Sequence, residues 1–491
     1  MDKIIGYILL TVAVISFVII ALQTLADDIW YDEVFSMGFI EHSYRDIVRL
    51  TSSDVHPPFY YFFLKAVTSV ICGIFPHVSI VVAAKITSLL PWLFTFAIAV
   101  SYVRAHYGYV TMGFFMVLVT MMPQLNNYYV EIRMYGLAGF LVTSCFLLIV
   151  SILKDGSKLY KWALLFISGI ATAYTQYYAC IAIVSLYITF GIILLYRKSR
   201  QIIWLLTISV MSVISFLPWM SVLLTQFTTV RAGYWIQPLT LRSIVGCVKF
   251  LVQPATVNGT VNMVAAGLIL LGLGAIIVSR IRSIREKIVE IVLGFAPIVL
   301  IILVGFVMSI AGMPVFVYRY MIPAAGCAYL CIAMMISGID IVTGVSIVSI
   351  TVGCMFSMKG FYDEEHKKVM MCNEAMEAIN EIPKGACIIT NFDHVTAITG
   401  YYRRDCDVYL YENDADKLLN EMFGRCGRSI VSDDVSNLIE EYPQVYFLGS
   451  FNSRDDIVNE WEQAGIHSTQ EGSYLIERYW FNKYRLEERN E

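Results

Sequence analysis

Long apolar blocks are the feature of this 491-residue chain that most constrains how it can fold. Each block approaches the roughly 20 residues that an α-helix needs to cross the hydrocarbon of a bilayer. Only 15% of the residues are charged and 58% are hydrophobic, whereas about 25% of the residues of an ordinary soluble domain are charged. A soluble fold of this length would lack the polar surface that it needs. The sequence therefore predicts a polytopic α-helical membrane protein.

We predict about eleven transmembrane helices. The first, residues 3–25, is too long for the apolar part of a secretory signal, and no clear A-x-A cleavage pattern follows it, so we expect a retained anchor. The stretch 58–75 is apolar but interrupted and rich in aromatic residues, and we interpret it as an interfacial or re-entrant helix. The other ten spans are expected near residues 79–103, 109–126, 133–153, 161–176, 178–196, 202–224, 260–279, 288–311, 316–337 and 341–357.

The basic residues test this arrangement, because cytoplasmic loops carry an excess of Lys and Arg. With the amino terminus in the cytoplasm, the major basic clusters all fall in inner loops, at Arg104, at 154–161, at 197–200 and at 280–287. A further span at 58–75 would place them on alternating sides of the membrane. An odd number of spans puts the carboxy-terminal tail on the extracytoplasmic side. We therefore expect a multi-pass protein of the cell membrane with an outer tail.

The chain divides into a membrane region, 1–358, with a first outer loop at 26–78, and a soluble region, 359–491. The soluble region holds 14 basic and 26 acidic residues, a net charge of −12, whereas the first 358 residues carry a net charge of +8. Strand-like runs at 386–390, 408–411, 445–448 and 474–477 alternate with helix-like runs at 365–381, 413–423, 433–441 and 454–464. This alternation predicts a small extracytoplasmic α/β domain with a partly parallel sheet.

Nothing in the tail indicates a metal site. Its four cysteines lack the CxxC spacing that is typical of zinc sites. The patterns from Asp405 to Asp407 and from Asp414 to Asp416 have the form of a metal–nucleotide DxD motif, but chance matches are expected in so acidic a segment.

The first outer loop carries the most informative acidic cluster. Residues 27–54 include seven acidic and only two basic residues. Asp32 and Glu33 stand out because they follow Trp30 and Tyr31, aromatic residues of the kind that settle at a membrane surface. An acidic pair held at that depth suits acid/base chemistry or cation binding, and a merely solvated pair is the alternative. We interpret Asp27, Asp28, Glu41 and Asp46 as solvated residues of an acidic loop, without a functional role.

Two further outer segments interrupt apolar sequence with polar residues. Glu131 and Arg133, followed by Tyr135, lie at a helix boundary, where an ion pair that orients the turn is the alternative to a functional role. Arg319, next to Tyr318, begins a late span. Its side chain either extends to the interface or binds a phosphate, whose oxygens fit the guanidinium fork.

These residues together resemble the GT-C superfamily of membrane glycosyltransferases, in particular the bacterial relatives of protein O-mannosyltransferases and aminoarabinose transferases (family 39-like). The matching motifs span residues 30–323 and share one predicted side of the membrane. They are the acidic pair Asp32 and Glu33, the Asp-x-His-Pro-Pro stretch with Asp54 and His56, the Glu-x-Arg-x-Tyr turn with Glu131, Arg133 and Tyr135, and the Arg-Tyr pair at Arg319. Gln176 departs from the family, since many relatives have His there, so we expect no acid/base role for it.

The resemblance implies an inverting glycosyltransferase that moves a hexose or pentose from a polyprenyl-phosphate donor to an extracytoplasmic acceptor. The acceptor, whether glycan, lipid or protein, is left open. Asp32 would be the catalytic base, with Glu33 beside it in the catalytic pair. No metal or other cofactor is expected, with a divalent metal as the alternative, and no nucleic acid is expected as a partner. The residues expected to bind substrate are Asp54, His56, Glu131, Arg133, Tyr135, Tyr318 and Arg319.

A secondary transporter or a flippase for lipid-linked sugars is the leading alternative. Transporters place ionisable residues near the membrane midplane and are often built from inverted repeats. Here the predicted spans are nearly free of charge, with Lys85 among the few exceptions, and no internal repeat is visible. A scaffold that presents the tail is a third hypothesis, but it would need only one span. The sequence favours the enzyme.

Overall fold

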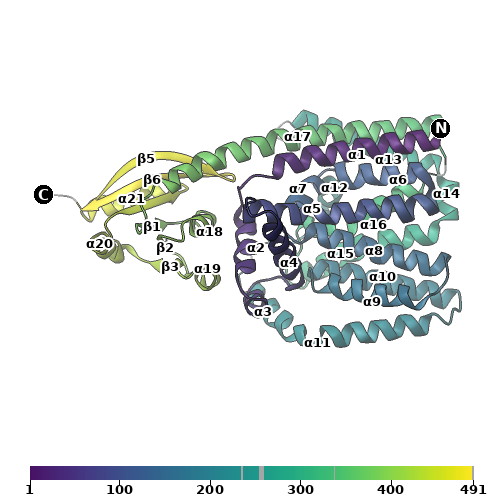
Figure 1. The fold of residues 1–491 in the computed structure, drawn as a ribbon, viewed down its shortest axis with the longest axis horizontal. Coiled ribbons are helices and arrows are strands. Elements are labelled where there is room, and N and C mark those ends of the chain that lie inside the picture. Colours follow the sequence, from purple (N-terminus) through teal and green to yellow (C-terminus); the bar gives the residue numbers. More distant parts are fainter. Residues whose placement is uncertain (234–235, 254–258, 337, 489–491) are drawn as a thin grey trace. The chain divides into compact units, whose positions relative to one another are not determined.

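The computed structural model describes residues 1–233, 236–253, 259–336 and 338–488, without the side chains of Asn126 and residues 229–233. The chain folds into two compact units. The first unit comprises Met1–Leu25, Val55–Leu64 and Lys85–Glu364. The second unit comprises Ala26–Asp54, Lys65–Ala84 and Glu365–Glu491. The first unit is a bundle of helices, and the second contains the only β-sheet among the described residues (Figure 1).

Eight helices of the described residues are long and apolar enough to cross a membrane. They are α1 (Asp2–Thr24), the run Ile80–Met121, α8 (Tyr135–Lys154), α10 (Tyr177–Tyr196), α11 (Ile202–Gly233), α13 (Gly259–Ser279), α15 (Ile288–Ile310) and α17 (Ile341–Asn380). Two shorter apolar helices are α4 (Phe59–Ile74) and α9 (Leu159–Ala173). The prediction of a multi-pass helical membrane protein is confirmed. The number of eleven spans and the interfacial position of 58–75 stay predictions.

The run Ile80–Met121 consists of more than one helix. It comprises α5 (Ile80–Ile98), the π-helical turn η1 (Ala99–Val103) and α6 (Arg104–Met121). Gly108, inside α6, has a φ of 89° and is not helical. Glycine adopts this left-handed conformation without the steric cost of a side chain. The break at Gly108 agrees with the two separate spans predicted at 79–103 and 109–126.

Close packing holds the first unit together. α1 lies against α6, and a Cβ atom on Gly113 would collide with the backbone oxygen of Gly6. Helices in lipid associate through such close van der Waals contact, because lipid tails are as apolar as the side chains. α16 (Ile322–Met334) is buried along nearly its whole length in the bundle. The remaining elements of this unit are α7 (Leu125–Val130), α12 (Leu241–Val252), α14 (Ile281–Glu286) and the 3₁₀ turn η2 (Tyr318–Met321).

The second unit is built on a six-stranded sheet of order β3-β2-β1-β4-β6-β5. The strands are β1 (Cys387–Thr390), β2 (Asp407–Tyr411), β3 (Cys426–Ile430), β4 (Val445–Ser450), β5 (Ile466–Ile476) and β6 (Tyr479–Glu488). The first four are parallel, and β6 is antiparallel to both β4 and β5. The helices are α2 (Tyr31–Glu41), α3 (Tyr44–Ser53), α18 (Asp393–Tyr402), α19 (Lys417–Phe423), α20 (Ser432–Glu441) and α21 (Ser453–Gln463). The predicted small α/β domain with a partly parallel sheet is confirmed.

The core of the sheet domain is apolar and aromatic. Every residue of β1 and β4 is buried, as expected for parallel strands that are covered on both faces. Trp461 of α21 is 0% exposed and meets Phe447 of β4 edge to face, with ring centroids 4.9 Å apart. This arrangement fixes α21 on the sheet.

The boundaries of the two units differ from those that the sequence suggested. The sequence placed the whole first loop, 26–78, with the membrane region and began the soluble region at residue 359. In the structure, Ala26–Asp54 and Lys65–Ala84 belong to the second unit, and the last segment of this unit begins at Glu365, inside α17. The physical reason lies in α2, where Val34, Met37 and Phe39 are all 0% exposed. These apolar residues need a partner surface, and α18 and α19 supply it.

Candidate functional site

The predicted catalytic pair lies in the first turn of α2, in the second unit. Glu33 is 3% exposed, and its Oε2 accepts a hydrogen bond from the backbone N–H of Trp30 at 3.1 Å. That contact caps the helix, because the first N–H groups of a helix have no partner within it. Asp32 is half-buried. Glu33 thus has a local structural role, and Asp32 has the more accessible carboxylate of the two.

Four carboxylates surround Tyr31. Burial raises the pKa of the Tyr31 hydroxyl, and the nearby charges of Asp393, Asp416, Asp32 and Asp54 raise it further. Asp32 and Asp54 come from the two ends of the first-loop segment, whereas Asp393 and Asp416 come from the sheet domain. The structure therefore brings two of the predicted residues into one acidic locality, together with two that the sequence did not select.

The two added acids have raised carboxyl pKa values, and Asp416 also caps a helix. Burial raises the pKa of the Asp393 carboxyl and also that of Asp416. Oδ1 of Asp416 accepts a hydrogen bond from the backbone N–H of Leu419 at 2.9 Å and caps α19. Asp405 pairs with Arg403. The DxD-like patterns thus contain a helix cap and an ion pair, and the only available signal for Asp416 was its acidity.

The predicted Glu-x-Arg-x-Tyr turn joins α7 to α8 in the first unit. Its backbone is tight, since the N–H of Arg133 donates to the carbonyl of Glu131 at 2.6 Å. Arg133 is 5% exposed and Tyr135 is 0% exposed, although both carry polar groups. A buried guanidinium at the end of apolar helices is costly, and in membrane proteins such groups are by default functional candidates.

Aromatic rings connect this turn to the predicted Arg319 segment. Tyr128 meets Tyr135 edge to face at 5.2 Å between ring centroids, and it lies 6.0 Å from Phe250 of α12. Phe250 in turn lies 6.2 Å from Tyr318, which precedes Arg319 in η2. Gly246 of α12 packs directly on the Tyr318 hydroxyl. Phe250 of α12 therefore links two segments of one unit that are far apart in the sequence, the α7–α8 turn region and η2.

The predicted His-Pro-Pro stretch directly precedes α4, which contacts α5. His56 is 9% exposed. Shortly after His56 in the sequence, the hydroxyl of Tyr60 lies 3.4 Å from Oγ of Ser88 in α5. Ser88 lines a small crevice that Tyr129 and Gly136 also line. His56, Glu131, Arg133, Tyr135, Tyr318 and Arg319 thus all belong to the first unit, whereas Asp32, Glu33 and Asp54 belong to the second.

Lys85 is a further candidate that was not among the predicted site residues. It lies in the first two turns of α5 and is only 4% exposed. A buried cation in an apolar span is a functional candidate on energetic grounds. Among the described residues, no group of three or more His, Cys, Asp or Glu side chains is arranged to hold a metal ion.

Comparison with known proteins finds similarity in structure. No family model matches the chain, and no curated protein sequence matches it. The chain is similar to the crystal structure of ArnT from Cupriavidus metallidurans bound to undecaprenyl phosphate, with a TM-score of 0.60 and 11% identity over 98% of this chain and 97% of that chain. It is also similar to ArnT from the same organism in the apo state, with a TM-score of 0.57 and 11% identity over 90% of this chain and 92% of that chain. At such low identity the likeness concerns the fold.

Proposed function

We propose, from the premise that this chain has the fold of the aminoarabinose transferase ArnT of the GT-C superfamily, that it is a membrane glycosyltransferase. It transfers a sugar from a polyprenyl-phosphate donor to an extracytoplasmic acceptor, with inversion at the anomeric carbon. The observation that carries the proposal is the similarity over nearly the full length of both chains to a structure that contains undecaprenyl phosphate. The four motifs that suggested this superfamily from the sequence support it independently.

The charge pattern supports a lipid-linked donor. With the basic loops in the cytoplasm, the amino terminus is cytoplasmic, and both the first loop and the sheet domain are extracytoplasmic. Nucleotide sugars are charged and remain in the cytoplasm. A sugar carried on a polyprenyl phosphate reaches the outer leaflet and delivers its phosphate to the membrane surface, where the polar residues at the ends of the helices can bind it.

The proposed reaction is a single displacement. The acceptor hydroxyl attacks the anomeric carbon from the side opposite the phosphate and forms the new glycosidic bond. Asp32 takes the proton from that hydroxyl, and the bond between the anomeric carbon and the phosphate oxygen breaks. The bonding electrons leave with the polyprenyl phosphate. General-base assistance of this kind contributes about 10²–10⁴-fold to the rate.

Cationic side chains at helix ends would stabilise the departing phosphate. Arg319 and Arg133 are proposed for this role, and buried Lys85 is a third candidate. Arginine suits it because its planar fork matches phosphate oxygens, and preorganised donors of this type often make the largest contribution to catalysis. The proposed orienting residues, which hold the sugar, the acceptor or the loop, are Glu33, Asp54, His56, Glu131, Tyr135 and Tyr318.

The test is transfer by the purified chain in lipid nanodiscs. A panel of labelled polyprenyl-phosphate hexoses and pentoses is supplied with membrane extract as the source of acceptor. We expect label to leave the lipid in the unsubstituted protein and to stay on it in Asp32→Asn. Full transfer by Asp32→Asn would refute the assignment of the base. Activity that survives exhaustive chelation supports a reaction without a metal, and loss that Mg²⁺ or Mn²⁺ restores overturns that expectation.

A flippase gives a different result in the same system. Reconstituted into vesicles, it would move labelled lipid to the opposite leaflet without forming a new glycoside. Translocation without transfer for every donor of the panel would overturn the proposed enzyme in favour of this alternative.

A further inference from the structure

Doubly wound α/β proteins bind ligands at the carboxyl ends of their parallel strands, at the point where the strand order reverses. The sheet domain has such a strand-reversal point, between β1 and β4. Here β1 leads through α18 to β2 on one side, whereas β4 lies on its other side. The two strand ends are tied together by Asn391, whose Oδ1 accepts from the N–H of Ser450 at 2.7 Å and whose Nδ2 donates to its carbonyl at 2.9 Å. Two hydrogen bonds thus join the ends of β1 and β4 at the reversal point.

Aromatic rings gather at this strand-reversal point. Phe392, just after β1, stacks on His394 with ring centroids 4.7 Å apart and rings within 5° of parallel. Phe451, just after β4, meets Phe392 edge to face at 4.7 Å between ring centroids. The ring of Tyr479, at the start of β6, lies 4.8 Å from that of Phe392 and 5.0 Å from that of His394. The strand-reversal point therefore carries a cluster of aromatic rings that includes an imidazole.

The chain's own first loop contacts this cluster. The ring of Tyr31 stacks on His394, with centroids 4.1 Å apart and rings within 12° of parallel. The backbone N–H of Tyr31 donates to Oε1 of Glu477 at 2.6 Å, and Oε2 of Glu477 lies 2.9 Å from Nδ1 of His394. A carboxylate is favoured at this position, since Tyr31 is the first residue of α2 and its N–H has no partner within the helix.

Glu477 is part of the turn that joins β5 to β6. Ile476 pairs with Tyr479, so the turn consists of Glu477 and Arg478, and the φ of 56° at Glu477 is the left-handed conformation that such hairpin turns take. The side chain of Glu477 is only 12% exposed. The hairpin turn therefore presents this carboxylate to the N–H of Tyr31 and the imidazole of His394.

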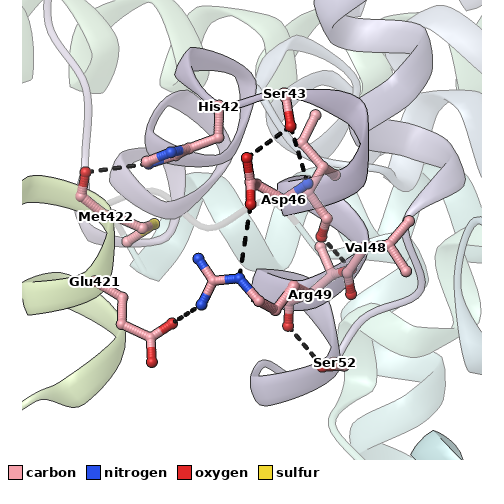
Figure 2. A network of polar contacts seen from close by, with 10 residues as sticks. His42, Ser43, Asp46, Val48, Arg49, Ser52, Glu421 and Met422 are labelled. Atoms are coloured by element: carbon pink, nitrogen blue, oxygen red, sulfur yellow. Dashed lines mark hydrogen bonds and ion pairs between the residues drawn. The ribbon is translucent and has the colours of Figure 1, made fainter.

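Independent contacts hold more of the segment after Tyr31 on the same domain. Nε2 of His42 lies 3.1 Å from the carbonyl oxygen of Met422, and Nη1 of Arg49 donates to Oε2 of Glu421 at 2.8 Å (Figure 2). A Cβ atom on Gly38 would lie 2.7 Å from Sδ of Met422, so α2 approaches α19 closely. The part of the first loop from Tyr31 to Arg49 is thus held on the sheet domain at several points.

We propose that the strand-reversal point of the sheet domain is a clamp for the amino end of α2, with Glu477 and His394 as positioning residues for Asp32. Asp32 follows Tyr31 directly, so any shift of the first turn of α2 moves its carboxylate. This inference rests on the proposed function, in which Asp32 is the base. A misplacement of about 1 Å in a catalytic group can cost on the order of a hundredfold in rate.

The experiment compares Glu477→Ala, Glu477→Gln and His394→Ala with a matched control, Glu462→Ala, in the full-length protein in nanodiscs. Glu462 makes the same kind of contacts elsewhere in the domain, since its Oε1 accepts from the N–H of Ser468 at 2.7 Å and lies 3.2 Å from Nδ1 of His467. Transfer kinetics with the labelled donor give kcat and KM separately. Hydrogen exchange of the peptide covering Tyr31–Glu41 reports how firmly α2 is held.

We expect Glu477→Ala and His394→Ala to lower kcat by about ten- to a hundredfold, with the KM for the donor changed less than about twofold, and to speed exchange in α2. Glu477→Gln keeps one acceptor oxygen and should retain more kcat than Glu477→Ala. Glu462→Ala should leave kcat and the exchange of α2 unchanged. Exchange in β1 and β4 must stay slow in every variant, which shows that the domain is folded.

Two outcomes overturn the clamp. One is a kcat that Glu477→Ala and His394→Ala leave within about twofold of the unsubstituted protein. The other is an exchange of α2 that neither variant alters. If the unsubstituted protein transfers no sugar from any donor, the proposed function fails, and hydrogen exchange alone then decides whether the clamp exists.

Discussion

The helical unit and the sheet unit are stabilised in different ways. In the helical unit, backbones approach closely, as Gly6 and Gly113 show, and ion pairs such as Lys154–Glu290 at 2.5 Å lie at the ends of helices. In the sheet unit, aromatic burial around Trp461 is combined with ion pairs that attach a loop, such as Arg49–Glu421. Water drives apolar side chains together, but lipid does not. The loop between two membrane segments therefore finds its apolar partner in the sheet domain.

The two units also differ in the catalytic roles that are proposed for their residues. The proposed base, Asp32, belongs to the sheet unit, and the proposed phosphate-binding residue, Arg319, belongs to the helical unit. The assignment of the base therefore depends on a correctly folded sheet unit, to which Asp32, Glu33 and Asp54 of the predicted motifs belong. The following predictions test this division of roles, from the largest expected effect to the smallest.

One substitution in each unit tests the catalytic roles. Asp32→Asn removes the base and should lower kcat by about 10²–10⁴-fold. Arg319→Gln removes charge stabilisation of the leaving phosphate and should lower kcat by about 10²–10³-fold. Steady-state transfer kinetics measure both. Asp46→Asn, in the exposed part of the same loop, is the control and should stay within about twofold of the unsubstituted rate.

The core of the sheet unit should be far more sensitive than its surface. Trp461→Ala leaves a cavity against Phe447 and should destabilise this unit by about 3–5 kcal/mol. Trp480 is 54% exposed, and Trp480→Ala should cost under about 0.5 kcal/mol. The free energy of unfolding of the two variants is compared by denaturant unfolding, which is monitored through the protection of the β4 amides from hydrogen exchange. If Trp461→Ala destabilised the unit as little as Trp480→Ala, the burial of Trp461 would contribute little to the stability of the sheet unit.

Asp416 should make the sheet unit less stable as the pH rises. Burial raises the pKa of its carboxyl, with repulsion from Asp393 and Asp54 adding to the effect. Between the unfolded pKa, about 3.9, and the higher folded pKa, the folded state binds more protons, so stability falls as pH increases through that window. Asp416→Asn keeps an acceptor for the N–H of Leu419 and should raise the melting temperature by about 2 °C at pH 7.

The control for this prediction is the same measurement at low pH. Below the pKa of the unfolded state, the Asp416 carboxyl is neutral in both the folded and the unfolded protein. The gain in melting temperature from Asp416→Asn should therefore disappear. An equal gain at pH 3 and pH 7 would mean that ionisation is not the cause.

The smallest effect is expected for the ion pair in Figure 2. The side chains of Arg49 and Glu421 are 57% and 46% exposed, and exposed pairs contribute about 0.2–1 kcal/mol. A double-mutant cycle with Arg49→Ala and Glu421→Ala should give a coupling energy in that range, which added salt should reduce. A coupling above about 2 kcal/mol would show that the loop depends on this pair more than on its apolar contacts.

Local sequence predicted three of the six strands well. The runs at 386–390, 408–411 and 445–448 correspond to β1, β2 and β4, which are rich in β-branched and aromatic residues. β3, with the sequence CGRSI, and β6 were not predicted, and the run at 474–477 covers only the end of β5. α18 was missed because Thr, Tyr and Gly are weak helix formers. Tertiary packing overrides local preference in these elements.

The candidate site was partly accessible from sequence. Asp32 and Asp54 were selected, and the structure places both near Tyr31, but Asp393 and Asp416 around the same residue could not be anticipated. Nor could Glu477, whose partner Tyr31 lies 446 positions away in the chain. The catalytic and binding roles of all nine selected residues stay predictions.

The sequence by itself determined that the chain crosses the membrane repeatedly and ends in a small α/β domain, because apolar length and periodicity are recorded within windows of about 20 residues. Only the tertiary structure decided the strand order, the link through Phe250 between the α7–α8 turn region and η2, and the attachment of the first loop to the sheet domain. Those features depend on which distant surfaces fit and bury one another, and no local pattern contains that information.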